Sequence, residues 1–415
     1  MPIRLNFFSP LGLILIAISV YVYLPFGYYW LISDSAIPYT FELTELYVFM
    51  PMVAYLFPLV VLLFILPRPL SRRPFILKNR QVNYKIVPIL TLVGLVSMYA
   101  LFWWLNKRYG FNNEWQILEN VIHYRLTIER DSALSIILRN LITTLAIFFV
   151  ALNWYVYQRT GKVLCLLLLC ASLLLALYFA VLSGRRRDLI SIILLLAFFL
   201  NFAPLFKGKV MGIKLHLALG LGALFIFLMS WYSFFRKGRE FQWINTDILY
   251  EFVRRFDGVF PNFYYLYNSN IANDYFFGIT YVRALLNFVP RSLFPEKHEN
   301  LQMYFNANLR LHADSGMDFG NFGEAWVNFG AFSLLFVSFY CVLLREFFNK
   351  LYLGVERQCF VSTALYAYTV YCLLQFFSSP IDSTNMMFYL INLAITYLAA
   401  RFFCTGAALP QAAPA

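Results

Sequence analysis

The sequence predicts an all-α integral membrane protein that crosses the bilayer about ten times. Of its 415 residues, 61% are hydrophobic and 13% are charged, whereas a soluble domain is about half apolar and about 25% charged. The mean hydropathy is +0.65, and the apolar residues gather in long runs rather than in the alternating pattern of an outer-membrane barrel. This composition excludes a soluble globular protein, and the 20% aromatic content excludes a disordered chain.

Ten apolar runs are long enough, at about 20 residues each, to cross the hydrocarbon core as helices. They form a single transmembrane domain over residues 1–404, and the small, uncharged residues 405–415 follow as a flexible cytoplasmic tail. The predicted spans are 11–32, 46–66, 86–105, 133–157, 163–183, 189–205, 215–235, 325–344, 359–378 and 384–403.

Lysine and arginine set the orientation of these spans, because short cytoplasmic loops are enriched in both. The loop 33–45 has neither residue and carries Asp34, Glu42 and Glu45, which places it outside the cytoplasm. Both termini are therefore predicted to be cytoplasmic, and the net charge of +12 reflects topology rather than a nucleic-acid partner. The loops on the cytoplasmic side carry Arg68, Arg72, Arg73, Lys78, Arg80 and Lys85, then Arg159 and Lys162, then Lys207, Lys209 and Lys214, then Arg345, Lys350 and Arg357.

The longest segment between predicted spans is the extracytoplasmic loop 236–324, between the seventh and eighth spans. It carries basic residues such as Arg254 and Arg255 in near balance with acidic ones, and aromatic residues such as Tyr264 lie among them. A polybasic lipid-binding tail is not balanced in this way. The pattern indicates a folded layer that lies on the bilayer with its rings at headgroup depth, and such rings also suit stacking on sugars.

Three consecutive arginines, Arg185, Arg186 and Arg187, lie in a short turn on the side that should be poor in positive charge. They precede an apolar run, so they fall at a helix start, where free N–H groups and the helix dipole favour anions. The arginine fork matches phosphate oxygens in two-point contact. The turn therefore predicts a phosphate or pyrophosphate clamp; the alternatives are interfacial anchoring and a cytoplasmic location of the turn.

Two stretches of the long loop combine charge with conformational restriction. In the first, Arg283 belongs to a short apolar helix that prolines end, and Arg291 falls at the stiffened turn between Pro290 and Pro295. In the second, glycines lead into the eighth span and place Glu324 near its extracytoplasmic end. A carboxylate there either complements the helix dipole or, if a membrane cleft buries it, serves as a general base.

The sequence offers no pattern for a metal site or a cofactor. The six cysteines lie in or beside predicted spans, and the four histidines are scattered, so neither residue type has metal-ligand spacing. No glycine-rich phosphate loop and no nucleophile elbow is present. We expect no metal, no cofactor, and neither ATPase nor serine-hydrolase chemistry.

Together these features resemble the Wzy-type polymerases of oligosaccharide repeat units in bacterial O-antigen and related surface polysaccharides. The resemblance rests on the turn S-G-R-R-R-D, the long loop, the run P-R-S-L-F-P and the segment G-E-A-W-V-N-F-G. It covers most of the chain as a layout of spans. It extends to motifs from about Val181 to Asp188 and from Arg283 to Gly330.

The resemblance implies a metal-independent glycosyltransferase of the bacterial inner membrane with an extracytoplasmic active face. It would transfer a glycan from undecaprenyl pyrophosphate to an acceptor hydroxyl on an incoming lipid-linked repeat, among membrane lipids and with a chain-length regulator as a plausible partner. Glu324 is the first choice for the general base, with Asp318, Asp314 and His312 as alternatives. The candidates for binding pyrophosphate are Arg185, Arg186, Arg187, Arg291, Arg254, Arg255 and Arg283.

Two other functions fit part of the sequence. An O-antigen ligase-like glycosyltransferase would use the same carrier and a similar layout, and His312 in the loop keeps this alternative open. A transporter or flippase for lipid-linked sugars would also need arginines for pyrophosphate. Transporters usually carry charges deep within their helices, whereas here Arg139 is the main charge inside a predicted span.

Overall fold

The computed structural model describes a mostly helical chain over residues 4–27, 46–66, 69–70, 74, 80–119, 133–182, 186–209, 211–214, 217, 220–224, 227, 276–286, 320–373, 375–378, 381 and 384–408. Within these residues, six helices are long and apolar enough to cross a membrane, which makes the chain a helical membrane protein. They are Pro10–Gly27, Val87–Arg108, Ile137–Thr160, Val163–Leu182, Asp188–Lys207 and Gly320–Glu356. Predicted spans 46–66 and 384–403 coincide with shorter apolar helices, Met52–Ile65 and Met386–Phe402.

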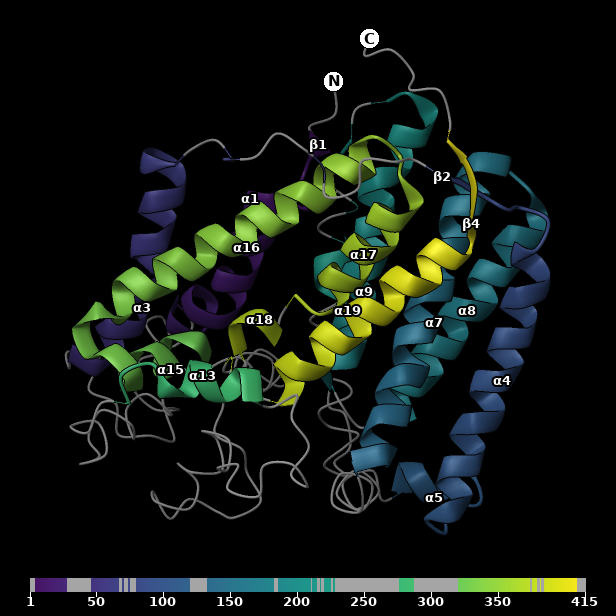
Figure 1. Ribbon diagram of the computed structural model, residues 1–415, viewed down its shortest axis with the longest axis horizontal. Helices are drawn as coiled ribbons and strands as arrows, with labels where there is room; N and C mark the ends of the chain where they lie inside the picture. Colours follow the sequence, from purple (N-terminus) through teal and green to yellow (C-terminus); the bar gives the residue numbers. More distant parts are fainter. Residues whose placement is uncertain are drawn as a thin grey trace.

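Figure 1 labels the helices of the described chain and the short strands β1, β2 and β4. The helices are α1 (Pro10–Ile18), α3 (Leu46–Val60), α4 (Val87–Arg108), α5 (Glu114–Glu119), α7 (Ala133–Thr160), α8 (Val163–Leu182), α9 (Arg186–Phe202), α13 (Ile279–Leu286), α15 (Gly320–Phe329), α16 (Ser333–Glu356), α17 (Phe360–Tyr371), α18 (Gln375–Ser378) and α19 (Thr384–Phe402). π-helical turns extend α1 over Ser19–Tyr23 and α3 over Val61–Ile65, and 3₁₀ turns cover Ala203–Lys207 and Gly330–Phe332. The strands are β1 (Arg4–Leu5), β2 (Arg80–Val82), β3 (Ile213–Lys214) and β4 (Cys404–Ala408).

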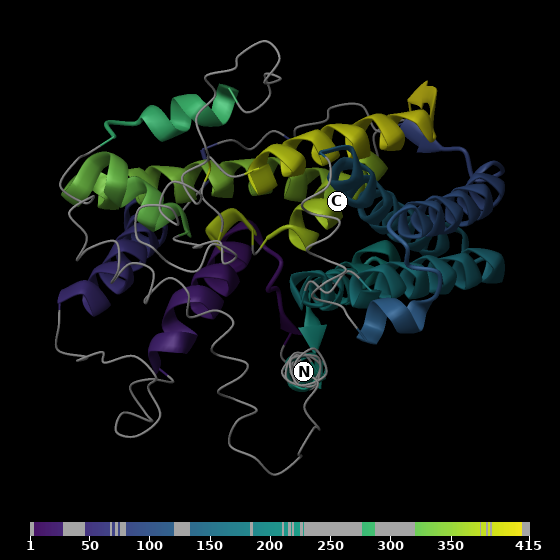
Figure 2. The same cartoon turned by 90° about the horizontal axis from the view of Figure 1, so that it is seen from below.

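The strands form two antiparallel ladders, β1 with β3 and β2 with β4. Both ladders lie at one end of the helices, and α5, α13 and α15 lie at the other (Figure 1). β4 includes residues 405–408 of the predicted tail and pairs with β2, in the segment that precedes α4. Viewed from below, α4, α7 and α8 stand together on one side, and α1, α3 and α16 stand on the other (Figure 2).

The eighth predicted span differs from the observed helix at both ends. The helical run begins at Gly320 and ends at Glu356, and the 3₁₀ turn Gly330–Phe332 divides it into α15 and α16. Gly330 has φ +54°, a left-handed conformation that glycine adopts without steric cost. Arg345 and Lys350, predicted to lie in a loop, extend α16 because both are good helix formers.

The ninth predicted span, 359–378, is not one helix. α17 ends at Tyr371, and α18 follows as a separate four-residue helix. The whole stretch is apolar, so hydropathy alone does not reveal the break. Carbonyl groups of α18 that a continuous helix would use internally are instead available to neighbouring elements, and the Phe376 carbonyl accepts a hydrogen bond from the Tyr340 hydroxyl at 3.0 Å.

A buried polar contact joins α4, α7 and α8. The Asn153 side chain is fully buried in α7 and donates to Ser172 Oγ of α8 at 3.3 Å. Thr91 of α4 donates to the Asn153 amide oxygen at 3.4 Å. Side-chain hydrogen bonds of this kind hold helices together where lipid offers no hydrophobic driving force between them.

Helix α17 is the centre of the bundle. Every residue from Phe360 to Tyr371 is buried, and the helix packs against α7, α9, α16 and α19. Two of its threonines bond locally: Thr363 and Thr369 donate to the carbonyls of Cys359 and Leu365, one turn earlier. α17 therefore has no face available to lipid.

The closest approach of α16 to α17 occurs at Gly354, and we expect Gly354→Ala to destabilise the protein by about 1–3 kcal/mol. A Cβ at this position would overlap the Cβ and Oγ of Ser362 on α17. Gly27→Ala is the matched control, because a Cβ there meets nothing within 4 Å. Thermal unfolding of the purified protein in detergent measures the difference; equal stability of the two variants would contradict the close approach.

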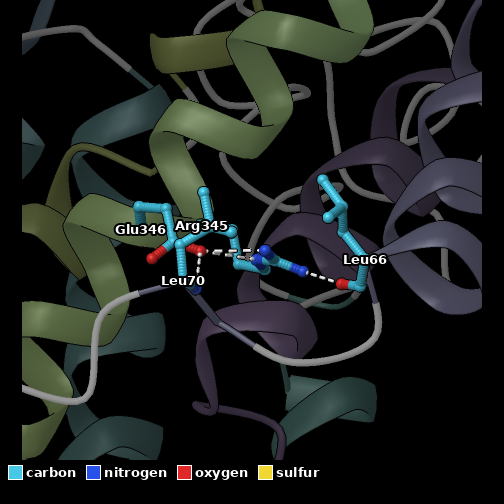
Figure 3. Close-up of polar contacts among 4 residues, drawn as sticks. All are labelled: Leu66, Leu70, Arg345 and Glu346. Atoms are coloured by element: carbon cyan, nitrogen blue, oxygen red, sulfur yellow. Dashed lines mark hydrogen bonds and ion pairs between the residues drawn. The ribbon is translucent and has the colours of Figure 1, made fainter.

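A buried arginine fastens the end of α3 to α16 (Figure 3). Arg345 is 3% exposed, and its Nη1 donates to the carbonyl of Leu66, just beyond the π-helical turn Val61–Ile65. Its Nε and Nη2 donate to Glu346 Oε1 at 3.2 and 2.8 Å. The Leu70 N–H donates to the same oxygen at 3.0 Å, so one arginine–glutamate pair binds the chain on both sides of residues 67–68.

Candidate functional site

The candidate site lies where α13, which belongs to the long loop, meets α15 and the segment between α18 and α19. α13 packs against α15, and α15 packs against α16 and α18. α15 is unusually enclosed for a short helix, because all its residues from Gly320 to Asn328 are buried. These elements lie at the end of the bundle opposite the strand ladders (Figure 1).

Glu324 is fully buried in this contact, and donors from two different elements hold its two carboxylate oxygens. The Thr280 hydroxyl of α13 donates to Oε1 at 3.0 Å. The Ile381 backbone N–H, between α18 and α19, donates to Oε2 at 2.5 Å. Because a buried charge is costly unless hydrogen bonds satisfy it, these donors explain how the carboxylate is tolerated at 0% exposure.

Asn328, one turn after Glu324, uses both ends of its amide. Its Oδ1 accepts from the Gly278 N–H at 2.9 Å. Its Nδ2 donates to Thr280 Oγ1 at 2.7 Å and to the Glu324 backbone carbonyl at 2.8 Å. Asn328 therefore ties the start of α13 to α15 and contacts the same hydroxyl that Glu324 uses.

The backbone before α13 completes this attachment. The N–H groups of Phe276 and Phe277 donate to the carbonyls of Val327 and Asn328, at 3.1 and 3.2 Å. These carbonyls lie at the end of α15, where a helix has no internal donors left. Phe277 has φ +46° and Gly278 has φ +86°; a positive φ is strained for phenylalanine, so this sharp turn is held by the contacts it makes.

Aromatic rings pack together where α13 meets α15 and α16. Tyr281 of α13 stacks on Phe336 and Phe329, with ring centroids 4.5 and 5.9 Å apart. Burial, followed by the nearby carboxylate of Glu324 and the hydroxyl of Tyr340, raises the pKa of the Tyr281 hydroxyl. Tyr281 is thus a neutral neighbour of Glu324.

Packing against α18 fixes the start of α15. The Asn321 side-chain amide donates to the Phe376 carbonyl, which also accepts from Tyr340. Gly320 has φ +63°, and a Cβ there would lie 2.7 Å from the Phe377 carbonyl oxygen. Glycine is required at this position for both its conformation and its size, so α15 and the end of the broken helix are fitted closely to each other.

Of the residues predicted to form a functional site, the described structure includes Glu324 and Arg283 with their side chains. Arg283 lies one turn after Thr280 on α13, and its guanidinium lies 6.0 Å from the centroid of the Phe276 ring. Arg186 and Arg187 form the start of α9 as predicted, but their side chains lie outside the described part of the chain. Also outside it are Asp318, Asp314, His312, Arg185, Arg254, Arg255 and Arg291.

Sequence reasoning missed Thr280, Asn328 and the Ile381 N–H. Thr280 and Asn328 are small polar residues without charge, and Thr280 is 44 positions from Glu324. The spacing of Glu324 and Asn328 by four residues would have placed both on one face of a helix. The role of Ile381 depends on the break after α17, for which the sequence gives no signal.

Glu324 thus connects a loop helix, a buried short helix and a helix break at one end of the membrane bundle. Irregular backbone at such depth is tolerated where protein encloses it, and it often accompanies a functional site. Compared with protein-family models, with curated proteins and with solved structures, the chain matches none of them.

Proposed function

We propose that this protein polymerises lipid-linked oligosaccharide repeat units in the synthesis of a bacterial surface polysaccharide. The observation that carries the proposal is the buried carboxylate of Glu324, held between the loop helix α13 and a broken membrane helix. Arg283 on the same loop helix adds a cation one turn from Thr280. The resemblance of the sequence to Wzy-type polymerases suggests the roles of this carboxylate and this arginine: a base for the acceptor hydroxyl and a ligand of the pyrophosphate.

The reaction requires one proton transfer and one leaving group. The acceptor hydroxyl gives its proton to a base and forms a bond to the anomeric carbon of the donor glycan. The bond from that carbon to the pyrophosphate oxygen breaks, and undecaprenyl pyrophosphate departs with the electron pair. Enzymes accelerate such transfers by orienting the acceptor and by stabilising the negative charge that develops on the leaving group.

Glu324 is the proposed base, and Asp318, Asp314 and His312 are the alternatives. Glu324 is 0% exposed, so the acceptor hydroxyl reaches it only when the contact between α15 and the segment containing Ile381 opens. The closed contact excludes water until substrate arrives, which protects the donor from hydrolysis.

The proposed ligands of the pyrophosphate are Arg283 and the arginines beyond the described residues or at the start of α9. Arginine is suited to this role because its fork binds two phosphate oxygens at once. A helix start adds free N–H groups of the right polarity. The set is Arg185, Arg186, Arg187, Arg254, Arg255, Arg283 and Arg291.

The proposal includes ten spans, cytoplasmic termini and an extracytoplasmic site in the bacterial inner membrane. This topology predicts that a cysteine introduced by Gly184→Cys, in a variant lacking the native cysteines, reacts with a membrane-impermeant thiol reagent in intact cells. Thr160→Cys is the matched control: Thr160 ends α7 just before α8 begins at Val163, so it lies at the opposite end of α8 from Gly184 and should react only after lysis. Labelling of Gly184→Cys only after lysis would place the arginines in the cytoplasm and remove their proposed role.

Reconstitution tests the function directly. Purified protein in liposomes should elongate purified lipid-linked repeats into a ladder without added metal or nucleotide sugar. A deletion strain should carry surface glycan of a single repeat. Long lipid-linked polymer in that strain would indicate a ligase, and movement of repeats across the liposome membrane without elongation would indicate a transporter; either result contradicts the proposal.

A further inference from the structure

The hydrogen bonds around Asn328 have only one consistent assignment. Its Oδ1 faces the Gly278 N–H at 2.9 Å, and a backbone N–H only donates. Its Nδ2 faces the Glu324 carbonyl at 2.8 Å, and a carbonyl only accepts. The amide orientation is therefore fixed from both ends, and Nδ2 must donate to Thr280 Oγ1, 2.7 Å away.

This assignment also determines where the Thr280 proton points. A threonine hydroxyl has one proton to donate. Since Thr280 Oγ1 accepts from Asn328, its proton is directed at Glu324 Oε1, 3.0 Å away. All three side chains are 0% exposed, so water does not compete for these bonds. A directed chain thus runs from Asn328 through Thr280 to one oxygen of the carboxylate.

The two oxygens of Glu324 are held differently. Oε1 is held by a side chain that is itself anchored to α13 and α15. Oε2 accepts from the backbone N–H of Ile381, which lies between the short helix α18 and α19. If the Ile381 N–H moves away, Oε2 loses this donor while the Thr280 contact to Oε1 remains.

We propose that Thr280 and Asn328 are positioning residues that hold Oε1 of Glu324 and so present Oε2 to the acceptor hydroxyl. The inference rests on the proposed function with Glu324 as base. The acceptor hydroxyl takes the place of the Ile381 N–H at Oε2 and gives its proton to that oxygen. Its oxygen then forms the glycosidic bond, and the pyrophosphate-linked carrier leaves with the electrons of the bond that breaks.

The neighbours of Glu324 agree with a carboxylate oriented by neutral donors. Tyr281 of α13 and Tyr340 of α16 lie close enough to interact electrostatically with Glu324. Hydrogen bonds from neutral groups stabilise the charged form of a carboxylate without neutralising it. The Thr280 bond should therefore affect both the geometry and the basicity of Oε2.

Thr280→Val tests the inference, because valine has the shape of threonine without the hydroxyl. We expect the kcat for elongation of purified lipid-linked repeats by reconstituted protein to fall about 10-fold, with KM nearly unchanged. The acid limb of the pH–rate profile should move to higher pH, since the charged form of the base is less stabilised. Thr280→Ser should restore both, and Asn328→Leu should shift the profile in the same direction as Thr280→Val.

Thr369→Val is the matched control for the loss of a buried hydroxyl. Thr369 is 0% exposed on α17, and its hydroxyl contacts the Leu365 carbonyl and the Tyr389 hydroxyl. This variant should keep the wild-type pH profile. Equal changes in Thr280→Val and Thr369→Val would show a merely structural role and overturn the inference.

Infrared spectroscopy follows the same contact without turnover. The carboxylate band that disappears in Glu324→Gln should shift in Thr280→Val and return to its position in Thr280→Ser. If the wild type elongates the repeats but Thr280→Val shifts neither the carboxylate band nor the acid limb of the pH–rate profile, only the positioning role is overturned. A wild type that does not elongate the purified repeats overturns the proposed function and the inference together.

Discussion

Replacing Glu324 by glutamine is expected to lower the rate of elongation of lipid-linked repeats by at least about 100-fold, which is the usual contribution of a general base. Glutamine has nearly the same shape but does not take a proton from the acceptor hydroxyl. Reconstituted protein with purified repeats gives the rate, and the ladder of surface glycan in a complemented deletion strain gives the effect in cells.

The fold should survive this substitution. Glutamine keeps one acceptor oxygen, whereas the carboxylate accepts from both Thr280 and Ile381. One donor therefore loses its partner, at a cost of about 1–3 kcal/mol. Thermal unfolding separates this cost from the loss of rate.

Glu356→Gln is the matched control for the loss of a carboxylate. Glu356 is partly buried at the far end of α16 and is not part of the proposed site. We expect its elongation rate to equal that of the wild type. A Glu324→Gln protein that is folded and elongates at the wild-type rate would exclude Glu324 as the base and leave Asp318, Asp314 and His312.

Replacing Arg345 by alanine is expected to lower the free energy of unfolding by about 3 kcal/mol. The guanidinium is 3% exposed and donates to the Leu66 carbonyl and to Glu346 Oε1. Its removal takes a donor from that carbonyl and takes the Arg345 cation from the Glu346 carboxylate, which is 14% exposed. Breaking one partner of a buried pair costs more than the pair itself contributes.

Arg401→Ala is the matched control, because Arg401 is exposed and bonds to the Tyr397 hydroxyl within its own helix. This variant should lose less than about 1 kcal/mol. A double-mutant cycle with Glu346→Ala isolates the part of this free energy that comes from the ion pair. Equal unfolding free energies of Arg345→Ala and Arg401→Ala would contradict the role of Arg345 in fastening α3 to α16.

Hydropathy was sufficient to predict much of the helical layout. The predicted spans 86–105, 133–157 and 163–183 coincide with α4, α7 and α8 within a few residues. Composition explains the success, since apolar residues continue around most of each helix whether it is largely exposed, as α4 and α8 are, or largely buried, as α7 is. The extension of α16 beyond residue 344 was missed, because Arg345 reads as a loop residue until its partner Leu66, 279 positions away, is known.

The candidate site was only partly predictable, because it too depends on contacts between residues far apart in the sequence. Glu324 stood out because a carboxylate beside an apolar run is rare; of the two alternatives left open for it, exposure at a helix end and burial, the structure has it fully buried. Thr280 is an ordinary residue in the sequence and gains its role only from contact with Glu324. The contact with Ile381 required the break after Tyr371, where the sequence remains apolar and no local pattern marks the end of α17.

The enclosure of α17 has a consequence for how the protein is assembled in the cell. Membrane helices leave the ribosome in chain order, so α7 and α9 are inserted before α17 exists. α17 covers part of the surfaces of α7 and α9 in the finished bundle. These surfaces must therefore stay uncovered, or be covered by lipid, while the chain from α9 to α17 is made. The bundle is complete only after residues 360–371 are inserted. A chain that ends before Phe360 would lack this central helix and would be open to the cell's membrane proteases.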